Sequence, residues 1–495
     1  MKIKYIFKLM LVTLVFTACT DEDIFQEDPD SIVIENFFQT PSEFESAIRG
    51  VYSRMKTVGY YGGSGGSGDL VAVGDLLSDN LITNPNGRGS NFQSHSWLYN
   101  DNTSPTALYQ QAYIAIARAN LILQNIDNLP DGDFKNGIEA EALAARAMLH
   151  FDVARFYSQM PTQSASAGGS LGIVYSNEFE PFAEPARLST VSEVYDLITA
   201  DLTRANSLIG AANAGETTRI NANVIRGLIS RVALAQGDYA RVIQAGQQVI
   251  NSVSPAAASE LFPLWISADN PGVLFELPFI VSDPLLDVNF SQGSGQSLIP
   301  EWSVDAAFYN LYDPATEPER IDAYFQTLTN NSLGETWIIV NKYINGVQQQ
   351  GLNDGRYLRV EEVILNVAEA HYLNTPSNEA AALQTLNRLR DARYSSYAGG
   401  ESGDDLFNAI MLERRKELAF ESSDRWFTLK RLQGVSGIPS MHTSGVQRTG
   451  NGHLADGSGV VPPGQVLAAG DTKWQLPLQQ TWLIENPNLV QNPGY

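Results

Sequence analysis

A pair of closely packed helices between residues 220 and 250 constrains the fold of this chain more than any other feature. A first helix is predicted to end near Gln236, and the turn Gly237-Asp238-Tyr239 follows it. A returning helix is indicated by apolar and small residues at helical spacing, which are Val242, Ile243, Gly246, Val249 and Ile250. Because alanine and glycine line the facing surfaces, we expect the two helices to approach closely.

A second helix pair is predicted between residues 360 and 389. Its first helix contains residues 361–370, a turn follows at residues 374–377, and residues 380–389 form the return. Both pairs are typical of a tetratricopeptide-like unit. They lie about 135 residues apart, which excludes a regular array of repeats of roughly 34 residues. We therefore expect helix pairs that are separated by insertions.

The predicted insertions are loops rich in glycine, proline and polar residues. They cover residues 60–68, 84–104, 262–300 and 435–470. Two further helices are predicted to begin at capping boxes, one at Thr40 with Glu43 and one at Thr190 with Glu193. Because no linker isolates a second domain, we predict a mostly α-helical fold in one unit from residue 40 to residue 495, with binding sites in the loops.

The charge of the chain excludes several classes of partner. The chain has 32 Lys and Arg against 55 Asp and Glu, which gives a formal net charge of −23. Its apolar residues, 43% of the total, are enough for a large core. Nucleic acid is excluded as a partner, because phosphate binding needs Lys and Arg. One cysteine and five scattered histidines provide no disulfide and no close pair of metal ligands. We therefore expect no cofactor and name no metal ligand, while a structural metal ion stays open.

The first 18 residues are typical of an export signal. Three lysines precede an apolar stretch at residues 9–16, which is too short to span a bilayer. Residues 16–19, Phe-Thr-Ala-Cys, resemble a bacterial lipobox, so we expect cleavage before Cys19 and acylation of its thiol. Acyl chains would anchor the protein without a transmembrane helix. The acidic residues 19–39 would then form a solvated tether.

The chain contains 40 glycines, so short glycine-containing catalytic motifs are expected to occur by chance. Residues 62–66 and 168–172 fit the pattern of a nucleophile elbow, and Gly63, Gly65 and Gly68 have the spacing of a dinucleotide-binding loop. An elbow needs a strand before it and a helix after it. These segments lie instead in loops rich in glycine and serine, so none of the motifs predicts an enzyme.

Several separated blocks of sequence carry a stronger signal. They are residues 37–52, 113–120, 139–147, 358–370, 386–390, 413–431 and the C-terminal stretch 486–495. Together these blocks resemble the SusD/RagB family of outer-membrane nutrient-binding lipoproteins over nearly the whole chain.

The resemblance implies a fold and a function. The fold would have about four tetratricopeptide-like helix pairs packed against a loop-rich, irregular half that carries the ligand face. The protein would lie at the surface of a Gram-negative outer membrane, bind glycan, deliver it to a SusC-like TonB-dependent transporter, and catalyse no reaction. Three alternatives stay open, which are a peptide-binding RagB-like lid, a surface glycosidase, and an adaptor with a concave helical groove.

The resemblance does not fix the ligand contacts, which vary with substrate in the family, so the candidates follow from the chemistry of glycan binding. A glycan binder needs flat aromatic faces, amides and an arginine. The residues that fit this requirement in or near the loops are Trp97, Tyr99, Arg88, Asn80, Asp79, Tyr60, Tyr61 and Trp337. Trp302, Trp426 and Trp482 are assigned to the scaffold. Since Arg88 is the one cation in these candidate loops, we expect a neutral glycan.

Overall fold

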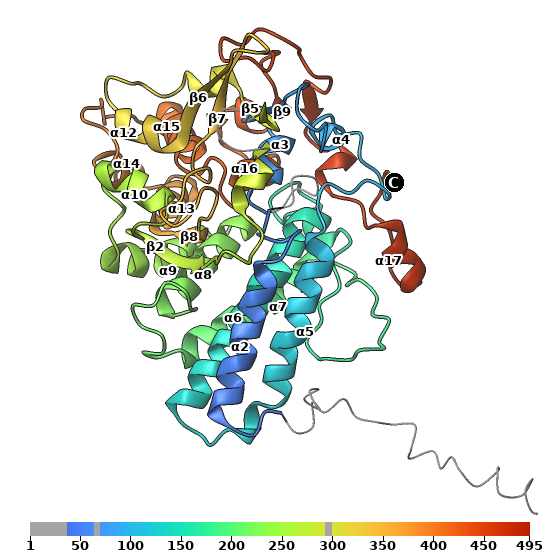
Figure 1. Cartoon of the computed structure of the whole chain (residues 1–495). Coiled ribbons are helices and arrows are strands. Elements are labelled where there is room, and N and C mark those ends of the chain that lie inside the picture. Colours follow the sequence, from blue (N-terminus) through green and yellow to red (C-terminus); the bar gives the residue numbers. More distant parts are fainter. Residues whose placement is uncertain (1–36, 64–69, 293–298) are drawn as a thin grey trace, which may run out of the picture.

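The computed structural model describes residues 37–63, 70–292 and 299–495 (Figure 1). The predicted signal at residues 1–18, Cys19 and most of the predicted tether lie outside the described residues, as does most of the Gly/Ser tract at 60–68. Within the described part of the chain, no helix has both the length and the apolar character needed to cross a membrane.

The helical half contains four pairs of packed helices among the described residues. In chain order these helices are α2 (Pro41–Met55), α5 (Leu108–Gln124), α6 (Asp133–Tyr157), α7 (Val191–Leu208), α8 (Ala222–Gln236), α9 (Tyr239–Ser252), α13 (Val360–Leu373) and α14 (Glu379–Arg390). Helix α2 packs on α5, α6 on α7, α8 on α9 and α13 on α14. The prediction of a mostly α-helical fold with about four helix pairs is confirmed.

The close approach predicted for residues 220–250 is present, and α13 joins it. Gly237 ends α8 with a φ of +76°, a left-handed conformation that favours glycine. A Cβ atom on Gly246 of α9 would lie 2.4 Å from Val367 of α13 and 3.8 Å from Ser230 of α8. Glycine at position 246 is therefore required by packing against α13 more than by packing against α8.

The loop-rich half is held together by short elements. The short helices are α3 (Val73–Leu77), α4 (Phe92–His95), α10 (Leu261–Trp265), α11 (Ala306–Tyr309), α12 (Pro318–Tyr324) and α17 (Gln480–Glu485). Two longer helices, α15 (Gly403–Glu417) and α16 (Asp424–Leu432), connect this half to the helix pairs.

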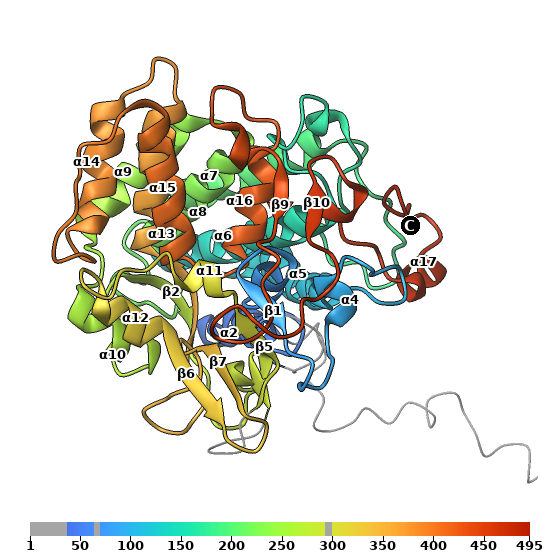
Figure 2. The same ribbon diagram turned by 90° about the horizontal axis from the view of Figure 1, so that it is seen from above.

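Antiparallel two-stranded sheets complete the loop-rich half. In the described residues there are five, which pair β1 (Leu81–Thr83) with β5 (Trp302–Val304), β2 (Val273–Leu277) with β8 (Gly355–Arg359), β3 (Ser291–Gln292) with β4 (Ile299–Pro300), β6 (Phe325–Asn330) with β7 (Glu335–Val340), and β9 (Gly445–Gln447) with β10 (Val466–Ala468). The β6–β7 hairpin lies at the edge of the molecule (Figure 2). Its outward residues are therefore open to solvent.

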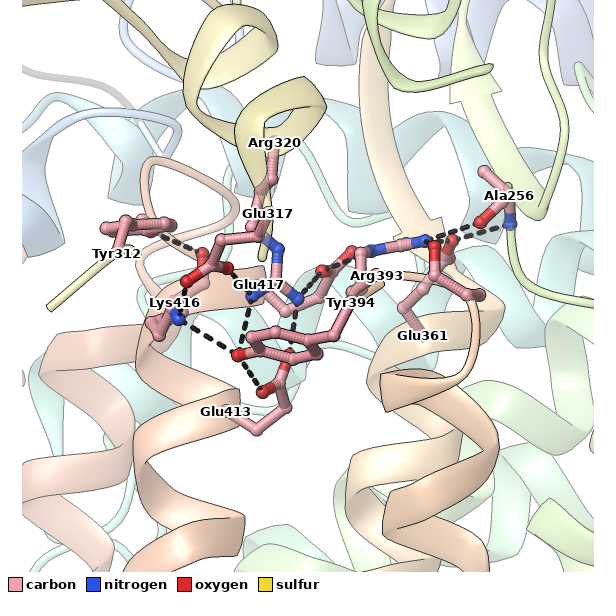
Figure 3. A network of polar contacts seen from close by, with 12 residues as sticks. Ala256, Tyr312, Glu317, Arg320, Glu361, Arg393, Tyr394, Glu413, Lys416 and Glu417 are labelled. Atoms are coloured by element: carbon pink, nitrogen blue, oxygen red, sulfur yellow. Dashed lines mark hydrogen bonds and ion pairs between the residues drawn. The ribbon is translucent and has the colours of Figure 1, made fainter. Parts of the chain in front are cut away.

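A buried network of ion pairs connects α12, α13 and α15 (Figure 3). Arg320 of α12 binds Glu413 and Glu417 of α15, and Arg393 joins Glu417 to Glu361 of α13. Although burial by itself would raise the pKa of Glu417, the guanidinium groups of Arg393, Arg320 and Arg359 hold this pKa well below its usual value. The network thus fixes the position of short helix α12 against the long helices.

Candidate functional site

Tyr60, Tyr61 and Trp337 are core side chains. All three are fully buried. The Tyr60 hydroxyl donates to Oδ2 of Asp152 at 2.6 Å, and the Tyr61 hydroxyl donates to the carbonyl oxygen of Arg356 at 2.7 Å. Trp337 packs with Ile339 and Ile344. The expectation that these rings offer a face to ligand is corrected, because core packing leaves none of them accessible.

Trp97 and Tyr99 are also covered by the chain. Only 6% of Trp97 is exposed, its Nε1 donates to the carbonyl oxygen of Leu77 at 3.0 Å, and the Arg448 guanidinium lies 4.1 Å from its ring centroid. Tyr99 is fully buried, and its hydroxyl donates to the carbonyl oxygen of Lys473. The prediction of ligand stacking on these rings is corrected, since the distant segment around residues 448–473 packs over them.

The polar candidates divide into structural and accessible side chains. Asp79 pairs with Arg425 at 2.8 Å and with Arg415 at 3.2 Å; although burial would raise its pKa, these two cations lower it. Asn80 is fully buried and donates to Asp75. Asp79 and Asn80 are therefore corrected to scaffold residues.

Arg88 is the candidate that keeps an accessible side chain, with 38% of it exposed. Its Nε donates to Oε2 of Glu301 at 3.1 Å, and its Nη2 donates to the carbonyl oxygen of Val288. The structure does not bring Arg88 and the predicted rings together as a ligand-binding surface. Arg88 stays a candidate at the rim of the loop-rich face.

A different feature of the loop-rich half combines an aromatic ring with exposed polar side chains. It is an open hollow of about 350 Å³ between α11, α12, the start of β6 and residues 341–345, which we call the Tyr309 hollow. Its lining consists of Tyr309, Ile321, Asp322, Phe325, Gln326, Thr327, Asn341 and Asn345. A second hollow of about 220 Å³ lies between α2 and residues 277–278, where Lys56 and Arg219 are already paired with carboxylates.

The aromatic wall of the Tyr309 hollow is fixed by packing. Tyr309 is half-buried, and its ring meets the buried ring of Phe325 edge to face with centroids 5.2 Å apart. Phe325 in turn packs edge to face on Tyr312 at 4.8 Å. The Tyr312 hydroxyl donates to the carbonyl oxygen of Lys416 at 2.7 Å, which attaches this cluster to α15. Tyr309 is therefore held in place before any ligand arrives.

The polar wall of the hollow has groups available for hydrogen bonding. Asn341 donates from Nδ2 to the backbone carbonyl oxygen of Asp322 at 2.9 Å, and Asn345 donates from Nδ2 to Oδ1 of Asn341 at 2.9 Å. Asp322, Gln326, Thr327 and Asn345 are exposed. Among the described residues, the carboxylate of Asp322 forms no ion pair. A carboxylate, amides and a hydroxyl beside an aromatic ring can bind sugar hydroxyls and the apolar face of a sugar ring.

The hollow could not be found from local sequence patterns, because its residues come from four segments. The strand β6 at residues 325–330 shows no strict alternation, since Phe325 is buried while both Gln326 and Thr327 are exposed. The contact of Tyr309 with Phe325 depends on tertiary packing and had no local signal.

Comparisons with known proteins match two separate stretches of the chain and its full length. Residues 67–234 match a family described as "Starch-binding associating with outer membrane", and residues 322–495 match the SusD family. The chain is 27% identical to SusD-like protein P2 from Formosa agariphila, and the alignment covers 100% of each chain.

Two solved structures are similar to this chain over most of its length. A SusD superfamily protein from Bacteroides thetaiotaomicron has a TM-score of 0.73 and 22% identity, over 92% of this chain and 100% of that chain. Surface glycan-binding protein A from Bacteroides uniformis has a TM-score of 0.71 and 18% identity, over 92% of this chain and 99% of that chain. At these identities the likeness to the solved structures shows a shared fold.

Proposed function

Because the chain belongs to the SusD/RagB family, we propose that it is a glycan-binding lipoprotein of the outer-membrane surface and that the Tyr309 hollow receives a saccharide unit. Arg88, at the rim of the same half, is proposed as a further contact for a longer glycan. Lipid attachment at Cys19 and delivery of the glycan to a SusC-like TonB-dependent transporter complete the proposal.

The observation that carries this function is the composition of the hollow. Tyr309 provides a fixed aromatic ring, and Asp322, Gln326 and Asn345 provide exposed oxygen and amide groups around it. A sugar presents C–H groups on its ring faces and hydroxyl groups at its edges. It can therefore stack on Tyr309 while its hydroxyls bind the polar wall.

The distribution of charge supports a neutral glycan. The buried side chains of the described residues include 14 Lys and Arg and 14 Asp and Glu, so the buried formal charge is zero. The whole excess of 55 acidic over 32 basic residues therefore lies outside this buried set. A surface of this charge repels polyanions unless cations gather locally.

Binding to a glycan array by the Cys19→Ser protein, followed by calorimetry, tests the function. We expect a neutral oligosaccharide to bind and to keep its chain length in chromatography of the mixture. Tyr309→Ala should weaken binding at least about thirtyfold, as is typical of an aromatic anchor. Tyr239→Ala, which removes a half-buried ring from α9 in the helical half, is the matched control and should bind normally.

Three results would contradict the proposal. Release of shorter products by the pure protein would indicate a hydrolase, and binding of peptides instead of glycans would favour the RagB-like alternative. Equal affinity of Tyr309→Ala and the unmodified protein would exclude the hollow as the glycan site.

A further inference from the structure

We propose that Asp322 determines the specificity of the Tyr309 hollow by admitting neutral saccharides and rejecting uronate or sulfated ones. This inference rests on the proposed function, because it assumes that the hollow receives a sugar. It goes beyond that function by assigning the choice of sugar class to one side chain.

The position of Asp322 is fixed by its surroundings. Its backbone carbonyl oxygen accepts a hydrogen bond from Nδ2 of Asn341, another lining residue, at 2.9 Å. Two residues earlier on α12, Arg320 is fully buried and binds Glu317 at 2.9 Å and Glu417 at 2.8 Å. The helix that carries Asp322 is therefore attached at both its backbone and its buried face, while the Asp322 side chain is exposed in the hollow.

The charge of Asp322 is not neutralised by a neighbour in the hollow. Within the described lining of the hollow, Asp322 is the one charged side chain. The nearest cations along the chain are committed elsewhere. Arg320 is paired within the network, and Lys342 donates to Oε1 of Glu421 at 2.6 Å and to the carbonyl oxygen of Ala419 at 2.8 Å. An anionic ligand in the hollow would therefore meet a carboxylate with no cation to compensate it.

The same carboxylate favours a neutral sugar. Its two oxygens are acceptors only, and they can accept hydrogen bonds from two adjacent sugar hydroxyls. Hydrogen bonds to an ionised acceptor are shorter and stronger than those to a neutral one. A carboxylate or sulfate on the sugar has no such donor at the corresponding position. Asp322 therefore favours one class of ligand and disfavours the other.

A matched pair of probes tests the inference. The first probe is the neutral oligosaccharide with the strongest signal on the glycan array, and the second is the same oligosaccharide oxidised at C6 to a uronate. We expect the unmodified protein to prefer the neutral probe at least tenfold in calorimetry. Asp322→Asn should bind the neutral probe about three- to tenfold more weakly and reduce the preference to less than threefold. Asp322→Lys should prefer the uronate.

Glu319→Gln is the matched control. Glu319 is an exposed carboxylate on the same helix α12, and it is not part of the lining of the hollow. Its replacement removes the same unit of charge and should leave the preference unchanged. Because all three substitutions are at exposed positions, their thermal melts should coincide with that of the unmodified protein.

The outcomes separate the inference from the proposed function. If Tyr309→Ala abolishes binding while Asp322→Asn keeps the full preference, the hollow is the glycan site and the role of Asp322 is wrong. If Glu319→Gln reduces the preference as much as Asp322→Asn, the general surface charge is responsible and the inference is also wrong. If neither probe binds the unmodified protein, both the inference and the proposed function are wrong.

Discussion

Tyr309 differs from the buried tryptophans of the loop-rich half in what surrounds it. Trp426 and Trp474 are fully buried and stack with centroids 4.2 Å apart, and Trp97 lies under Arg448. Tyr309 packs on Phe325 and lines an open hollow. An aromatic ring can contact ligand only where the chain leaves part of it uncovered, so burial separates stacking platforms from core residues.

The role of Trp97 can be tested by truncation. Trp97→Ala removes a buried ring, the hydrogen bond to Leu77 and the surface beneath Arg448. We expect a loss of about 3–5 kcal/mol in the free energy of unfolding, and a change of less than about threefold in glycan affinity where the protein is folded. Urea denaturation and calorimetry measure the two quantities. A stable Trp97→Ala protein that has lost its affinity would return Trp97 to the binding site.

At the scale of elements, α12 connects the Tyr309 hollow to the buried network. Its residue Asp322 lines the hollow, and its residue Arg320 binds three carboxylates in the interior. Replacing one partner of such a network leaves buried charges without compensation, which typically costs about 3–5 kcal/mol. Stability of the hollow and stability of the network are therefore coupled through a single short helix.

This network makes a prediction for acid unfolding. Despite burial, Arg393, Arg320 and Arg359 depress the pKa of Glu417 in the folded protein well below the ordinary glutamate value of 4.5. Because the folded pKa is the lower one, the stabilisation is present above pH 4.5 and is lost as the pH falls below it. We expect the free energy of unfolding to decrease steeply below that pH in urea melts.

Two variants check the origin of this acid sensitivity. Glu417→Gln should be less stable at pH 7 and should lose less further stability on acidification, because one carboxylate with a depressed pKa is gone. Glu319→Gln removes an exposed carboxylate of α12 outside the network and should follow the unmodified protein. An acid transition that is as steep in Glu417→Gln as in the unmodified protein would show that other groups cause it.

The elements differ in how far the sequence could predict them. The α8–α9 pair has its turn at Gly237 and its small residues in one local stretch, so periodicity and turn chemistry predicted it. The network was not predictable in this way, because Arg320 and Glu417 are 97 residues apart and meet only in the folded chain. The burial of Trp97 is not predictable from local sequence for the same reason, since Arg448 covers this ring from 351 positions later in the chain.

At the scale of the whole molecule, the buried charges balance, whereas the remaining charges have a net negative sum. Inside, 14 cations and 14 carboxylates balance, as low-dielectric surroundings require. Outside, the excess of acidic residues remains unpaired and gives the surface a negative potential. This division allows an acidic protein to have many arginines while its net negative charge stays outside the buried set.

The division predicts how glycan binding responds to salt. A neutral oligosaccharide held by stacking and hydroxyl hydrogen bonds carries no charge for the surface to attract, so its affinity should change by less than about twofold when ionic strength rises from 0.05 to 0.5 M. The uronate probe should behave differently, because screening weakens its repulsion and its affinity for the unmodified protein should rise with salt. In Asp322→Lys a local attraction replaces that repulsion, so the affinity for the uronate should fall with salt instead. Calorimetry across the salt series distinguishes these slopes, and tight uronate binding by the unmodified protein that weakens with salt would contradict the neutral-glycan proposal.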